Sequence, residues 1–75
     1  MGIIVGEVRF NGALAPGAKL YTNTGGCAIA PDGTYMMVVP PGICTVVAHY
    51  NGKAGSQSGV QVLPGDVTVV NIDIS

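Results

Sequence analysis

The segment Ala30–Gly42, APDGTYMMVVPPG, decides the fold of this chain. Pro31-Asp32-Gly33 gives a turn signal before a short apolar run, and Pro40-Pro41-Gly42 gives another after it, because Pro presets φ and Gly reaches positive φ. The run between them, Thr34–Val39, has the length and the Tyr and Val content of a β-strand. Its residues do not alternate between apolar and polar, so the sequence predicts a strand with two apolar faces.

The same punctuation recurs along the whole chain. Twelve Gly and five Pro interrupt short runs rich in Val, Ile, Thr and Tyr, a rhythm typical of an all-β sandwich or barrel. The small polar segment 53–59, KAGSQSG, is predicted to be a loop. We predict a single domain over residues 1–75 with seven strands: Ile3–Phe10, Ala18–Asn23, Cys27–Ala30, Thr34–Val39, Ile43–Tyr50, Gly59–Leu63 and Val67–Ile74.

The composition limits the kinds of partner that this chain can bind. Only 9% of the residues are charged and the net charge is -1, which argues against nucleic-acid binding through phosphate neutralisation. The first ten residues lack the basic region of a secretory signal, and no apolar run approaches the roughly 20 residues of a membrane helix. Low charge favours association with other proteins. The chain is consistent with a short complete gene product or an excised domain.

Cys27 and Cys44 leave two interpretations open. They could form one disulfide in an oxidising compartment. The favoured interpretation is that both are small buried apolar residues. The sequence has no CxxC motif, so neither a redox pair nor a zinc ribbon is indicated.

Turn motifs at fixed places along the chain identify a family. They lie within GEVRFNGALAPGAKLYTN (6–23), APDGTYMMVVPPGICTVVAHYNGK (30–53) and VQVLPGDVTVVNIDIS (60–75). The chain resembles the carboxypeptidase regulatory-like domains, and the matching positions are Gly6, Val8, Pro16–Leu20, Asp32–Tyr35, Pro40–Gly42 and Gly65–Asp66. The resemblance implies a transthyretin-like and Ig-like β-sandwich, which we expect to be a seven-stranded Greek key.

The resemblance says less about function than about fold. Cys44 stands where the family often has an aromatic residue, and Ile29-Ala30 replaces its Thr-Asp. The family consists mainly of non-catalytic modules on enzymes, transporters and surface proteins. The resemblance therefore implies a scaffold or binding role and supplies no active-site residues.

Strand alternation assigns the side chains to faces. Tyr35 faces the core in the family, and alternation then predicts an inward set of Leu20, Tyr35, Met37, Val39, Cys44, Val46, Ala48, Val70, Ile72 and Ile74. If the strands 34–39 and 43–50 pair as a hairpin, their outward residues form one apolar patch. We predict that this patch is a protein interface made of Met36, Val38, Thr45 and Val47, with Tyr21 as a further outward residue. The alternative is ordinary surface, since exposed apolar atoms are common.

Groups for catalysis or metal binding do not converge in this sequence. The single His, His49, could be combined with Ser56 or Ser58 and Asp66, but nothing in the spacing brings these residues together. There is no D-x-D-x-D run for calcium, and Gly25-Gly26 lacks the Lys of a phosphate-binding loop. We therefore predict no catalytic residue, no metal and no cofactor.

The predicted function is a non-enzymatic structural or interaction module. Its partner would be another protein or a second copy, bound through an apolar strand face. The concrete form is an accessory subunit of a larger assembly such as a phage virion, as a capsid decoration or tail appendage. The alternative is an extracellular adhesion or carbohydrate-binding module of a longer surface protein, in which Tyr21 or Tyr50 would stack on sugar. The sequence leaves open whether the location is the virion or the cell exterior.

Overall fold

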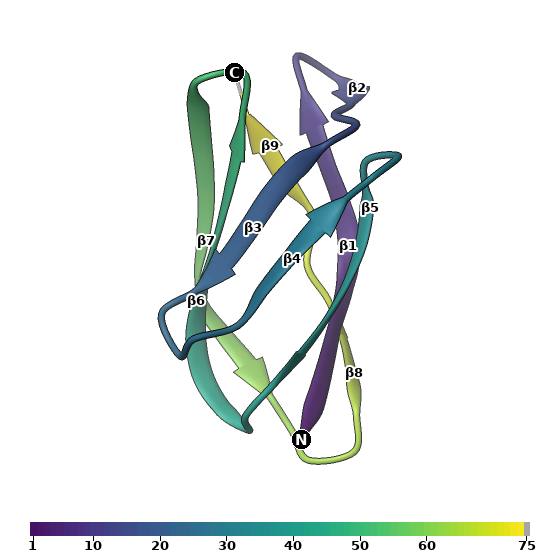
Figure 1. Cartoon of the computed structure of the whole chain (residues 1–75). Coiled ribbons are helices and arrows are strands. Elements are labelled where there is room, and N and C mark those ends of the chain that lie inside the picture. Colours follow the sequence, from purple (N-terminus) through teal and green to yellow (C-terminus); the bar gives the residue numbers. More distant parts are fainter. Residues whose placement is uncertain (75) are drawn as a thin grey trace.

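The structure is a computed structural model that describes residues 1–74, and it consists of two packed β-sheets (Figure 1). Sheet I contains β1 (Gly2–Phe10), β2 (Ala13–Leu14), β5 (Thr34–Val39), β8 (Val67–Val69) and β9 (Ile72–Ile74). Sheet II contains β3 (Ala18–Thr22), β4 (Cys27–Ala30), β6 (Gly42–Tyr50) and β7 (Lys53–Val62). The predicted all-β sandwich is confirmed. The described residues include no helix of a kind that could cross a membrane.

Strand β1 is the centre of sheet I. It pairs antiparallel with β5 over Gly2–Glu7 and with β2 at its end, and it pairs in parallel with β8 and β9 along its other edge. The predicted last strand is therefore interrupted at Val70-Asn71. At the interruption the Tyr35 hydroxyl donates a buried hydrogen bond to the Val70 carbonyl at 2.7 Å.

Sheet II has the order β4-β3-β6-β7, and it corrects the prediction for residues 53–59. The segment KAGSQSG is strand rather than loop, because the Asn51-Gly52 turn, with φ of 52° and 75°, is a two-residue hairpin connection that pairs His49 with Ala54. Opposite Thr45 the strand carries one extra residue, a β-bulge at which Gly59 has φ of 67°. Register set by the turn overrides the low strand propensity of small polar residues.

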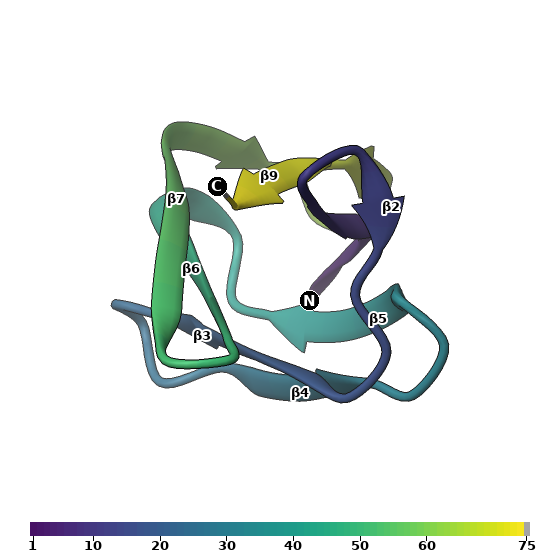
Figure 2. The same cartoon turned by 90° about the horizontal axis from the view of Figure 1, so that it is seen from above.

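The hairpin predicted between residues 34–39 and 43–50 is wrong. Strand β5 pairs with β1 in sheet I, whereas β6 pairs with β3 and β7 in sheet II. Pro40-Pro41 carries the chain from one sheet to the other, and neither Pro has an N–H for a ladder. Seen from above, β6 lies at the left beside β7 and β5 lies to the right (Figure 2), in agreement with their places in different sheets.

The core lies between the sheets and has the side chains that alternation predicts. All ten predicted inward residues are buried, and Ile4, Val8, Val60 and Val62 join them. Of the two cysteines, Cys44 is buried and Cys27 is exposed, and both are free. The prediction of two buried cysteines is therefore wrong for Cys27, which pairs with the exposed Tyr21 on the outer side of sheet II.

Candidate functional site

The outer side of sheet I carries an unbroken apolar surface, which we call the apolar face. In register, Val38, Ile3 and Val67 form one row across β5, β1 and β8, and Met36, Val5 and Val69 form the next. Residues paired across neighbouring strands project from the same side of a sheet. These six side chains therefore form a two-by-three array with no polar member.

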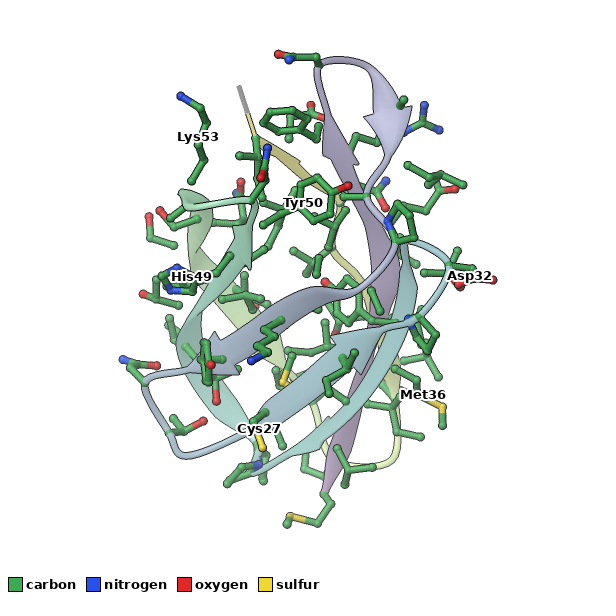
Figure 3. The ribbon with its side chains drawn as sticks, turned by 45° about the horizontal axis from the view of Figure 1, so that its top comes forward. Cys27, Asp32, Met36, His49, Tyr50 and Lys53 are labelled. Carbon is green, nitrogen blue, oxygen red and sulfur yellow. The ribbon has the colours of Figure 1, made fainter. Side chains whose placement is uncertain are left out.

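The array is open to solvent on both flanks. Met36 is 66% exposed and Val38 56% on β5, and Val67 and Val69 are 60% and 67% exposed on β8. Ile3 and Val5 lie between these strands and are half-buried. Figure 3 shows the Met36 side chain pointing away from the ribbon. The apolar face is thus a shallow surface, and its most accessible side chains are those on the flanking strands β5 and β8.

Polar groups mark the limit of the apolar face at one end. The next paired row consists of Thr34 and Glu7, and the backbone N–H of Glu7 donates to the Asn71 side chain at 3.0 Å. Glu7 also forms an exposed ion pair with Arg9 at 3.2 Å. At the opposite end Met1 is exposed. The apolar face therefore has one polar border, as expected for the rim of an interface.

An Asx turn holds the beginning of β5 beside this border. The Asp32 carboxylate accepts hydrogen bonds from the Thr34 hydroxyl at 2.6 Å and from the Thr34 N–H at 3.1 Å. Both bonds lower the pKa of Asp32, and the bond from the Thr34 hydroxyl has the larger effect. The turn fixes where β5 starts and thereby which of its residues join the apolar face.

The structure separates the predicted interface residues. Met36 and Val38 lie on the apolar face, but Thr45 and Val47 lie half-buried on the outer side of β6, and Tyr21 lies exposed on β3. Grouping the four into one patch was wrong because β5 and β6 do not pair.

Four residues of the apolar face, Ile3, Val5, Val67 and Val69, were not predicted as interface. Their sequence signal was the lack of polar alternation in Ile3–Val5 and the apolar residues at 67 and 69. What the sequence could not supply was the parallel pairing that brings them together.

The outer side of sheet II is more mixed. The rings of Tyr21 and His49 meet edge to face with centroids 5.5 Å apart. Beside them lies a shallow pocket of about 440 Å³, lined by Lys19, Tyr21, Cys27, Ala28 and Ile29. This pocket is the place on sheet II where a small ligand could contact an exposed ring.

The residues considered for catalysis are distributed over both sheets. His49 pairs with Ala54, which puts Ser56 near it on the outer side of sheet II. Asp66 lies instead in the loop before β8, where its carbonyl accepts the N–H of Ile3 at 3.0 Å. A groove of about 430 Å³ between β7 and the β8–β9 segment is lined by Gln57, Gly59, Val60, Gln61 and Thr68–Asn71. No aspartate, glutamate or histidine lines it.

Comparison with known proteins supports the fold. No protein-family model matches the chain. No curated protein sequence matches it either. The chain is similar to a solved structure, that of a DUF3823 family protein from Parabacteroides merdae, with a TM-score of 0.61 and 17% identity over 99% of this chain. This chain spans 45% of that protein's length. At this identity the likeness concerns the fold alone.

Proposed function

We propose that this protein is a non-catalytic interaction module that binds another protein through the apolar face. The observation that carries the proposal is the array of six apolar side chains across β5, β1 and β8. Contiguous exposed apolar surface with a polar rim is typical of protein-binding sites on soluble domains. The array lies on a rigid sheet, so a partner would find it preformed.

The energetics favour coverage of this surface. Fully burying a Val or Met side chain contributes about 1.5–3 kcal/mol. The four flanking residues of the apolar face are each more than half exposed: Met36, Val38, Val67 and Val69. Covering them would contribute roughly 1 kcal/mol each by the same scale. A few kcal/mol suits a module that docks on a larger body.

The concrete form of the proposal is an accessory subunit of a larger assembly, such as a capsid decoration or tail appendage of a phage virion. Low charge, small size and the apolar face support it. The turn motifs of the carboxypeptidase regulatory-like domains support a scaffold role by analogy of fold, which is a weaker argument than the apolar face itself.

Charge placed on the apolar face tests the proposal. We expect Met36→Lys and Val69→Lys each to reduce binding of the natural partner at least tenfold, because the lysine ammonium would have to be desolvated in the interface. Ile43→Lys is the matched control, since Ile43 is 71% exposed on β6 of sheet II. The measurement is capture from a lysate of the source organism, quantified by mass spectrometry. Equal loss for Ile43→Lys, or no loss for the other two, would contradict the proposal.

A second candidate function is sugar binding at the pocket beside Tyr21, as part of an adhesion module. Tyr21 is 45% exposed and lines that pocket with Lys19, and aromatic rings are the usual stacking surface for sugars. Tyr50 suits this role less, because its ring packs against Phe10 with centroids 5.3 Å apart. Glycan-array binding that Tyr21→Ala abolishes and Met36→Lys spares would favour this candidate over the first.

A further inference from the structure

Strand β5 is an edge of sheet I, and its outward backbone groups can be identified. The N–H of Val8 donates to the Gly33 carbonyl at 2.7 Å, in register with the β1–β5 pairing. In antiparallel sheets, pairs that exchange hydrogen bonds alternate with pairs that do not. Tyr35, Met37 and Val39 therefore direct their backbone groups toward β1. Thr34, Met36 and Val38 direct theirs outward.

Two of these three residues have free edge groups. The N–H of Thr34 is taken by the Asp32 carboxylate. Within residues 1–74, the N–H and C=O groups of Met36 and Val38 have no hydrogen-bond partner in the protein. The edge therefore offers two donors and two acceptors, alternating along one line.

Nothing in the sequence of β5 protects this edge. Natural edge strands are commonly protected by charge, by Pro or by a bulge. Thr34–Val39 contains no charged residue and no Pro, and its pairing with β1 runs without a register shift. Short, uncharged segments of high β propensity are the ones that pair with a further strand.

We infer that β5 pairs antiparallel with β5 of a second copy of this chain, about a twofold axis at Met37. In this register Met36 of one copy lies opposite Val38 of the other, and the reverse holds as well. All four free groups of each copy then form hydrogen bonds, and outward side chains stay with outward side chains. A register centred on Met36 would instead use Thr34, whose N–H is already taken.

The second copy is the favoured occupant because this edge is its own complement. A twofold interface uses the same patch on both copies, and β5 supplies donors and acceptors in the order that such symmetry requires. No like charges meet, since Thr34–Val39 carries none.

Pairing also enlarges the apolar face, and this consequence rests on the proposed function. The twofold axis is perpendicular to the sheet, so both faces lie on the same side and join across the two β5 strands. Stable interfaces commonly bury about 800 Å² per partner, whereas three strands about 4.8 Å apart with two rows of side chains cover only a fraction of that area. Two copies together present twelve side chains in six strands.

Sizing of the purified protein tests the pairing. We expect the mass from light scattering to rise from 7.5 kDa toward twice that value as the concentration increases to the millimolar range. Val38→Pro removes an outward donor and leaves the β1 ladder intact, so we expect at least a tenfold weaker self-association. Val38→Thr keeps the N–H and the branched shape and is the matched control. A monomer throughout, or dimers that survive Val38→Pro, would overturn the inference.

Cross-linking tests the register. In a Cys27→Ser background, one sample of Met36→Cys is mixed with one of Val38→Cys and oxidised mildly. Opposite residues in a hydrogen-bonded pair have Cα atoms about 5.5 Å apart, within disulfide range, whereas diagonal neighbours are about 7–8 Å apart. We expect the mixed disulfide to exceed either homodimer severalfold. Equal yields of all three would overturn the register.

The two proposals fail separately. Val69→Lys lies on β8, away from the β5 edge, so it should reduce partner binding at least tenfold and leave the mass of the dimer unchanged. Val38→Pro should reduce the dimer and changes one of the six side chains of each apolar face, so its partner binding is compared with that of Val38→Thr, which changes the same side chain and keeps the N–H. Loss of partner binding by Val69→Lys with an intact dimer supports the apolar face. A wild-type protein that stays monomeric at all concentrations and still binds the partner refutes the pairing alone.

Discussion

Gly6→Ala is expected to cost about 3–5 kcal/mol of folding free energy, as overpacking adds to the loss of buried hydrogen bonds. A Cβ at position 6 would lie 1.7 Å from the Val70 carbonyl oxygen and 2.6 Å from its carbon. Both atoms are backbone, so the Val70 segment would have to move. That movement would break the Tyr35 hydroxyl bond and the bond from the Val70 N–H to the Val5 carbonyl at 2.8 Å.

A loss of this size is a large share of the total for so small a domain. At about 0.05–0.15 kcal/mol per residue, the whole chain has roughly 4–11 kcal/mol of stability. The measurement is urea unfolding followed by circular dichroism. Gly12→Ala is the matched control, because its Cβ meets open space and its φ of 85° costs only about 1–2 kcal/mol. Equal midpoints for the two variants would contradict the packing argument.

Alkali is expected to destabilise the protein through Tyr35. Burial raises the pKa of this phenol to about 12 from its ordinary 10.0. Because the folded state holds the proton more tightly than the unfolded chain, the contribution is complete below pH 10. It is lost as the pH rises from about 10 to about 12, up to about 2.7 kcal/mol in all at 1.36 kcal/mol per unit.

Tyr35→Phe isolates this effect. At neutral pH the variant should be about 1–2 kcal/mol less stable than the wild type, because the buried Val70 carbonyl loses its donor. As the pH passes 10 the difference should shrink and then reverse, since the variant has no phenol to ionise. Urea midpoints measured from pH 8 to pH 11.5 decide the matter, with the exposed Tyr21→Phe as control. Parallel pH curves for wild type and Tyr35→Phe would refute the assignment.

The sequence predicted those parts of the fold that depend on local signals. The bounds of Cys27–Ala30 and Thr34–Val39 are confirmed because turn residues flank both strands. The inward residues are confirmed because strand side chains alternate with a period of two. The first half of β7 was missed, since small polar residues give no apolar pattern and their pairing is imposed by the Asn51-Gly52 turn.

The candidate site depended on information that no local pattern carries. Val38 and Met36 were identified from their own strand, but Val67 and Val69 join them only through parallel pairing with Ile3 and Val5. Residues 3 and 67 are 64 positions apart, so no turn motif in the sequence predicts that their strands pair. The assumed β5–β6 hairpin failed for the opposite reason: short connections usually join paired strands, and Pro40-Pro41 here joins different sheets.

The central place of β1 also determines when sheet I can form during synthesis. Strand β1 is made before β8 and β9, which it needs as parallel neighbours before sheet I is complete. A ribosome that adds about 5–20 residues per second leaves β1 without its parallel neighbours for roughly 3–13 s. During that interval Ile3–Val5 has no finished sheet to join, and β5 is the neighbouring strand that can pair with it first. Sheet I can therefore be completed only after Ile74 has been made.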